Sequence, residues 1–496
     1  MGGCTQRVRR WGIGSAPGRR AGGAVVALIA VASATTPSRA LEDAAGAERE
    51  SEGTTDASTD TSAPVSAPVR PREEPEASDA APMGDSGMRK FTLENGLDVV
   101  VAVDRLRPRV GIALQVDAGF EDDPPEYEGL AHVTEHAMFE GAAHSRSGDY
   151  WHSLRRLGAT YVQAMTGERR TVYLSEVPRD SLAQALWIEA ERAALALEHL
   201  DADGVRRAVE SVIDEAKHRS RDTFGVAVQA IYGPGHSLAR RGSFEVEHID
   251  LDEVRWFVQQ HYDPSNATLA LVGDLEIDAT ERLVRDIFSR WAARPGLGAK
   301  AHRARRDTTD RLTENTVLHE HARLWRQRLS IVWPVADASM HMTLELQAIA
   351  TALRTAVRDR GLDHAGVRAH DLGPGRPRVF SIMLWLPTTH GFELASGALQ
   401  TVLERVCATD RPPQVTTELA SAIALNRQHA ILTWDLYAHR AAALAGRPEE
   451  ASYASLRAQL QAHAALTPEG VAATCRRLLV DGRRVEVWTG WDEHGL

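Results

Sequence analysis

Residues 129–141 read Gly-Leu-Ala-His-Val-Thr-Glu-His-Ala-Met-Phe-Glu-Gly, an apolar run interrupted by two histidines and a glutamate. Residues four apart lie one above the other on a helix, so His132 and His136 can direct two imidazole nitrogens at one ion. Glu135 follows His132 by three residues and shares that face, where it can serve as a general base. We therefore predict a metal site on a helix that begins near Gly129.

The spacing His-x-x-Glu-His is the inverted form of a zinc-protease motif, and a catalytic zinc ion needs a third protein ligand. The predicted helix 202–219 carries an apolar stripe formed by Val205, Ala208, Val209, Val212 and Ala216. Glu215 lies at the edge of this stripe, where a buried carboxylate needs a partner. Glu215 is the candidate third ligand. Asp214 and Glu210 are alternatives, and a solvated Glu215 on the helix flank remains open.

The first 87 residues differ from the rest in charge and composition. Residues 1–40 hold six arginines and no acid, and their apolar stretch 21–34 is followed by small residues, which predicts an export signal. As a helix this stretch spans about 21 Å, short of the roughly 30 Å hydrocarbon core, so no stable membrane span is expected. Residues 41–87 are acidic and poor in aliphatic side chains, which predicts a disordered linker. We expect the protein to be exported, either to the periplasm or out of the cell.

Composition excludes several classes of function. A net charge of -11 without a basic stripe argues against nucleic acid as a partner. The sequence has neither a Gly-rich phosphate loop after a strand nor a Gly-x-Ser-x-Gly elbow, which argues against nucleotide-binding and serine-hydrolase sites. After export only Cys407 and Cys475 remain, and they can form one disulfide or stay as two buried thiols.

From residue 88 onward, strand and helix patterns alternate as in an α+β protein. The turn pair Asn95-Gly96 predicts an opening hairpin, and a similar order of elements recurs in the second half, including one long helix over 415–445. The predicted organisation is a metal-binding domain at 88–293, a linker at 294–312 and a second domain at 313–496.

The sequence resembles the pitrilysin/insulinase family of zinc metallopeptidases, in particular its bacterial members similar to mitochondrial processing peptidase. The family motif Gly-Leu-Ala-His-x-x-Glu-His-x-x-Phe-x-Gly matches residues 129–141, and Ser-Val-Ile-Asp-Glu ends at Glu215, 79 residues after His136. The segment Tyr-x-Pro-x-Asn-x-x-Leu-x-x-x-Gly-Asp at 262–274 also agrees. The resemblance implies two homologous domains, each a mostly antiparallel sheet flanked by helices, which enclose a cavity.

The resemblance also implies roles for individual residues. His132, His136 and Glu215 would bind one zinc ion per chain, and Glu135 would be the general base. Substrate contacts would come from Gln163, Arg358 and His364, which stand at positions where the family motifs have substrate-contacting residues.

This sequence departs from the family pattern at three positions. An acid that supports a zinc ligand is replaced by Ala208, the asparagine that contacts the substrate backbone is Gln163, and the second-domain tyrosine is His364. The expected function is a zinc endopeptidase that cleaves peptides or unfolded segments. The alternative is a zinc-retaining subunit that is non-catalytic or depends on a related chain, in a homodimer or a heterodimer.

Overall fold

The computed structural model describes residues 87–490 except 141–148, 220–222, 234–245, 295–309, 322–326, 338, 363, 371–377, 387–391, 411–412 and 447–450. The predicted export signal and nearly all of the predicted acidic linker lie outside these residues. None of the helices in the described part of the chain has the length and hydropathy needed to cross a bilayer.

The first half of the chain builds a six-stranded sheet. Its strands are β1 (Met88–Thr92), β2 (Asp98–Val103), β3 (Arg109–Val116), β4 (Tyr161–Thr166), β5 (Thr171–Pro178) and β6 (Ala267–Gly273). They lie in the order β1-β2-β6-β3-β5-β4, and only the β2–β6 pair is parallel. The predicted opening hairpin is confirmed, because β1 pairs with β2 across a turn in which Gly96 has a φ of 91°.

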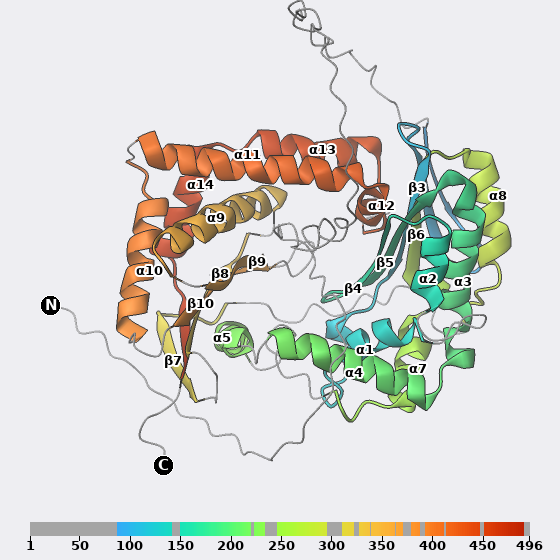
Figure 1. Ribbon diagram of the computed structural model, residues 1–496, viewed down its shortest axis with the longest axis horizontal. Helices are drawn as coiled ribbons and strands as arrows, with labels where there is room; N and C mark the ends of the chain where they lie inside the picture. The colour runs from blue at the N-terminus through green and yellow to red at the C-terminus, as the bar shows by residue number, and fades with distance from the viewer. Residues whose placement is uncertain are drawn as a thin grey trace, which may run out of the picture.

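Seven described helices accompany this sheet. They are α1 (Leu130–Ala137), α2 (Asp149–Arg156), α3 (Leu182–His199), α4 (Ala202–Arg219), α5 (Thr223–Tyr232), α7 (Leu251–His261) and α8 (Ile277–Phe288). Most of them bury their apolar faces against one face of the sheet, in a core shared by Val133 of α1, Leu186 of α3 and Phe288 of α8. Figure 1 shows α2, α3 and α8 on the outer side of the first sheet and α1, α4 and α7 below it.

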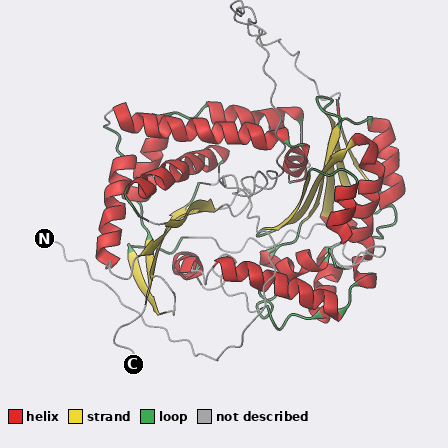
Figure 2. Ribbon diagram, viewed as in Figure 1, coloured by secondary structure: helices red, strands yellow, loops and turns green. Residues whose placement is uncertain are grey.

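The second half repeats this arrangement. Its strands are β7 (Thr316–His321), β8 (Gln327–Val335), β9 (His364–His370), β10 (Arg378–Leu386) and β11 (Val485–Gly490). Their order β7-β11-β8-β10-β9 matches β2-β6-β3-β5-β4 strand for strand, with the parallel pair in the same place. The two sheets occupy separate halves of the molecule (Figure 2). The predicted α+β class with mostly antiparallel sheets is confirmed.

The helices of the second half are α9 (Met340–Asp359), α10 (Phe392–Val406), α11 (Pro413–Asp435), α12 (Tyr437–Ala445), α13 (Tyr453–Ala464) and α14 (Pro468–Cys475). The single helix predicted over 415–445 is wrong, because α11 ends and α12 begins at an extended residue, Leu436. Cys407 and Cys475 follow α10 and end α14, and they form a disulfide with a Cα–Cα distance of 5.0 Å.

Each half gives one helix to the other, and the break at Leu436 separates α12 from α11. Helix α12 packs on the second face of the first sheet, and α5 packs on β8 and β11 of the second sheet. The α12 backbone comes so close to β3 that a Cβ at Gly111 would lie 2.1 Å from the Tyr437 carbonyl carbon. The buried Glu176 carboxylate accepts a 2.6 Å hydrogen bond from the Tyr437 backbone N–H at the start of α12. The domain boundaries stay a prediction, since the two halves share these cores.

Candidate metal centre on helix α1

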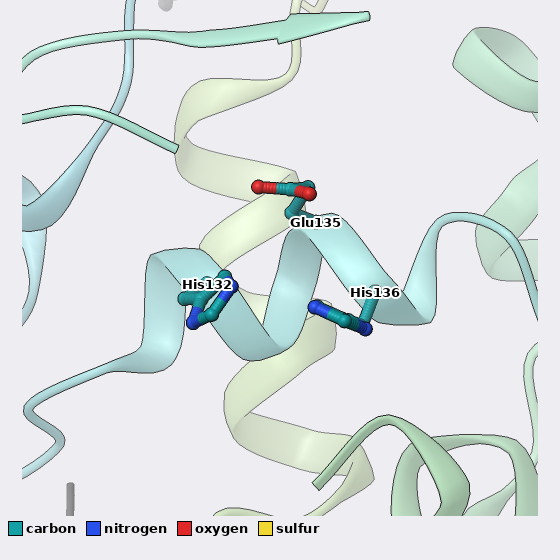
Figure 3. A group of neighbouring side chains, drawn as sticks. All are labelled: His132, Glu135 and His136. Atoms are coloured by element: carbon teal, nitrogen blue, oxygen red, sulfur yellow. The ribbon is translucent and has the colours of Figure 1, made fainter. Parts of the chain in front are cut away.

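The geometry of one helical turn brings the two predicted histidines together. The rings of His132 and His136 on α1 have centroids 4.9 Å apart, and their nitrogens lie within 4.8 Å of a Glu135 carboxylate oxygen. Figure 3 shows both imidazoles on α1 with the Glu135 carboxylate projecting from the turn between them. Among the described residues this is the one group of three or more His, Cys, Asp and Glu side chains close enough to hold a metal.

Glu215 of α4 completes a three-residue donor set. Its Oε2 lies 3.6 Å from His132 Nε2 and its Oε1 lies 3.4 Å from His136 Nε2. Two ligand atoms bound at 2.0–2.1 Å to one tetrahedral zinc ion are about 3.3 to 3.4 Å apart, so these separations suit a shared zinc ion. Two neutral imidazoles and one carboxylate are also ordinary zinc donors. The donor set therefore fits zinc.

Helix α4 is held in the register that presents Glu215 to α1. Val205, Ala208 and Val212 are buried in the same core as Val133 of α1, as the apolar stripe predicts. Glu210 lies on the exposed face and pairs with Arg206 at 2.9 Å, and Asp214 is also exposed. Of the three acids considered from the sequence, Glu215 is thus the one that the fold turns toward both imidazoles.

The N-terminus of α1 is capped from a distance, which the sequence patterns did not predict. Asp123 is buried, and its carboxylate accepts hydrogen bonds from the backbone N–H groups of Gly129 at 2.8 Å and Ala131 at 2.7 Å. Gly129 has a φ of 93°, a conformation that suits glycine. Asp123 lies seven positions before Leu130, the first residue of the helix, whereas the usual N-cap directly precedes it. No local pattern could therefore reveal this contact.

A buried ionic network supports the sheet next to α1. Arg192 donates a 2.6 Å hydrogen bond to Glu189, and its guanidinium lies 3.5 Å from the ring centre of Tyr173. The Tyr173 and Tyr262 hydroxyls are 2.9 Å apart. Burial raises the pKa of the Tyr173 hydroxyl well above its usual value and that of Tyr262 to about 12, so both stay protonated at neutral pH. The network joins Tyr173 of β5 to Glu189 and Arg192 of α3.

Of the three predicted substrate-contact residues, Gln163 and Arg358 do not join this group, and the side chain of His364 lies outside the described part of the chain. Gln163 alternates along β4 with residues that face α1, and its Oε1 accepts a hydrogen bond from the Tyr161 hydroxyl on the α12 side. Arg358 is exposed in the last turn of α9, and the His364 backbone begins β9. Their roles stay predictions.

Two cavities on the described surface lie away from this group. One of about 480 Å³ is lined by Arg89, Arg105 and the start of α8, and one of about 440 Å³ lies between α11, α13 and the start of α14. Neither includes a residue of α1.

Family models decide the relationship of the chain to known proteins. The model described as insulinase (peptidase family M16) matches residues 99–231, and the model of the peptidase M16 inactive domain matches residues 248–388. The chain belongs to peptidase family M16. The M16 match of the first half includes all of α1 and the Glu215 helix segment, so the candidate metal centre lies within it.

Individual relatives share low sequence identity with this chain. Coenzyme PQQ synthesis protein F of Pseudomonas aeruginosa is 32% identical over 202 residues, which cover 39% of this chain and 26% of that protein. A protease from Helicobacter pylori has the same fold, with a TM-score of 0.66 at 16% identity, over 81% of this chain and 99% of that one. The periplasmic protease PqqL of Escherichia coli matches with a TM-score of 0.54 at 16% identity, over 83% of this chain and 48% of that one.

The chain therefore spans about a quarter of the length of the curated relative and about half of the PqqL chain. These matches establish the fold and the family.

The cap on α1 gives a prediction. Asp123→Ala should lower the free energy of unfolding by about 1 to 2 kcal/mol, because two helix N–H groups lose their acceptor. It should also weaken zinc binding, since α1 carries two of the donors. Thr467 caps the remote helix α14 through the Gly470 N–H, so Thr467→Ala is the matched control. Chemical denaturation and zinc titration of both variants test this; equal zinc affinity in the two would contradict it.

Proposed function

We propose that this M16 protein is a zinc-dependent endopeptidase that cleaves peptides or unfolded segments. In this proposal His132, His136 and Glu215 hold one zinc ion, and Glu135 is the general base. The observation that carries it is the approach of both Nε2 atoms to the two oxygens of a single carboxylate, at 3.4 and 3.6 Å, beside Glu135. Relatives named zinc proteases support the same chemistry.

Zinc, when bound, lowers the pKa of a water molecule toward neutrality and polarises the peptide carbonyl. The residues of the chain then have two tasks. The Glu135 carboxylate accepts a proton from the attacking water and returns it to the leaving amine, which needs a carboxylate near the metal that is not itself a ligand. Only 6% of the Glu135 surface is exposed, so this residue is shielded from bulk solvent.

The edge strand β4 of the first sheet supports peptides and unfolded segments as the substrate class. Strand β4 ends the sheet order, and no described strand pairs with its outer side. An exposed edge offers backbone N–H and C=O groups to an extended peptide, and β4 contacts α1. An extended segment added at β4 would lie beside Glu135.

We also propose that the protein acts outside the cytoplasm. The basic and apolar N-terminal segment supports export. The buried Cys407–Cys475 disulfide is typical of oxidising compartments, and the structural relative PqqL is described as periplasmic.

A second candidate is a zinc-retaining subunit that needs a related chain for activity. The chain corresponds to about half of PqqL, and Ala208 packs in the hydrophobic core at the position where the family pattern has an acid. Intact Glu135 favours the enzyme, because a purely structural zinc site has no use for a base.

Mixing separates the two candidates. The purified protein alone is expected to cleave a mixed peptide library, and adding an equimolar second M16 chain from the same source should leave the rate within about twofold of the sum of the separate rates. Cleavage that begins only after the second chain is added would favour the partner-dependent subunit. Each chain should also be tested with its base glutamate replaced by glutamine, which shows which of the two active sites cleaves the peptides.

A further inference from the structure

Thr166 contacts the carboxylate to which the proposed function assigns the proton transfer. Its Oγ1 donates a hydrogen bond of 2.5 Å to Glu135 Oε2. The two residues are 31 positions apart, and the contact forms because Thr166 ends β4 on the same face as Val162 and Ala164, which pack in the α1 core. The hydroxyl hydrogen donated to Oε2 fixes the orientation of the Glu135 carboxylate relative to β4.

The position of Thr166 is fixed by backbone contacts to the segment that leads into α1. Three hydrogen bonds join this segment to the tip of the β4–β5 hairpin: Phe120 N to Gly167 O (3.0 Å), Glu121 N to Glu168 O (2.8 Å) and Thr171 Oγ1 to Ala118 O (2.9 Å). Gly119 permits the close approach, since a Cβ there would lie 2.2 Å from the Gly167 oxygen. These bonds hold the hairpin tip against the 118–121 segment, and Asp123, two residues further on, caps the start of α1.

This anchoring matters because a glutamate side chain has three rotatable bonds. Without a fixed donor, the Glu135 carboxylate can adopt several rotamers, of which only some lie next to the two imidazoles. A hydrogen bond from a residue that cannot move selects one rotamer in advance, which is how enzymes hold a base in its productive position.

We propose that Thr166 is a positioning residue that holds Glu135 in its productive rotamer. This inference rests on the proposed function. It assigns to Thr166 a task in proton transfer, distinct from zinc binding and from the contacts that hold substrate.

The test compares Thr166→Val, which removes the donor but keeps the shape, with Thr166→Ser, which keeps the donor. Thr166→Val is expected to lower kcat about 10- to 100-fold and to change KM by less than about twofold, because the lost hydrogen bond is made to a charged group. Thr166→Ser should restore kcat to within about threefold of the unchanged protein. Zinc content and the unfolding temperature should stay the same in both variants.

Thr160→Val is the matched control. Thr160 lies just before β4, and its hydroxyl accepts a 2.8 Å hydrogen bond from Arg109 instead of contacting α1. Its kcat should stay within about twofold of the unchanged protein. Should Thr166→Val fail to fold, Thr166→Ala replaces it, and a kcat equal to that of Thr166→Ser would overturn the inference.

Two results overturn the inference while the proposed function stands. One is a Thr166→Val protein with unchanged kcat, and the other is a Thr166→Ser protein as impaired as Thr166→Val. Loss of zinc in Thr166→Val would also overturn it, since the residue would then act through the metal site. An unchanged protein without Glu135-dependent cleavage would instead overturn the proposed function, and the inference with it.

Discussion

Glu135→Gln is expected to abolish peptide hydrolysis while leaving one zinc ion per chain. Glutamine keeps the shape and a hydrogen-bond acceptor for Thr166, but it cannot accept the proton from the attacking water. General-base catalysis contributes roughly 10²- to 10⁴-fold, so kcat should fall by at least about 10²-fold. Steady-state kinetics together with metal analysis of the same preparation measure both quantities.

A Glu135→Gln protein that retains activity would refute the assignment of the base. A protein that loses its zinc together with its activity would instead place Glu135 among the metal ligands. The second result would conflict with the geometry in which Glu215, and not Glu135, spans both Nε2 atoms.

Glu215→Gln is expected to have the largest effect on metal affinity. Removing a ligand should weaken zinc binding by more than the roughly 10- to 100-fold that loss of an outer-shell partner costs. The fold should persist, because Glu215 lies at the edge of the α4 stripe and is not part of the core. Competition with a chelator of known affinity measures the change.

The same helix provides matched controls. Glu210→Gln and Asp214→Asn change acids on the exposed side of α4, and zinc affinity should stay within about twofold of the unchanged protein. Unchanged affinity in Glu215→Gln, or a loss in Asp214→Asn, would show that the third ligand is wrongly assigned.

Local patterns predict the part of the site that lies on single helices. The stripe over 202–219 gives the bounds of α4 and places Glu215 at its edge, and the His-x-x-Glu-His spacing places three groups on one turn. These patterns do not predict which elements far apart in the sequence come into contact. The contact between Thr166 and Glu135, and the cap that Asp123 provides, depend on how the 118–121 segment meets the β4–β5 hairpin.

The exchange of helices is hidden in the sequence for a related reason. Residues 223–232 form a short run with apolar residues on most sides, and periodicity alone cannot distinguish a buried helix from a strand there. Only the contact of α5 with the second sheet makes it a helix with a buried surface. Likewise, the apolar pattern continues through Leu436, although the chain turns there so that α12 can reach β3.

Zinc content measured together with cleavage of a mixed peptide library tests the central claim most directly, with Glu135→Gln protein analysed in parallel. The predicted result is one zinc ion per chain in both proteins and cleavage only by the protein that retains Glu135. Protein that binds no zinc, or cleavage that survives Glu135→Gln, would contradict the account.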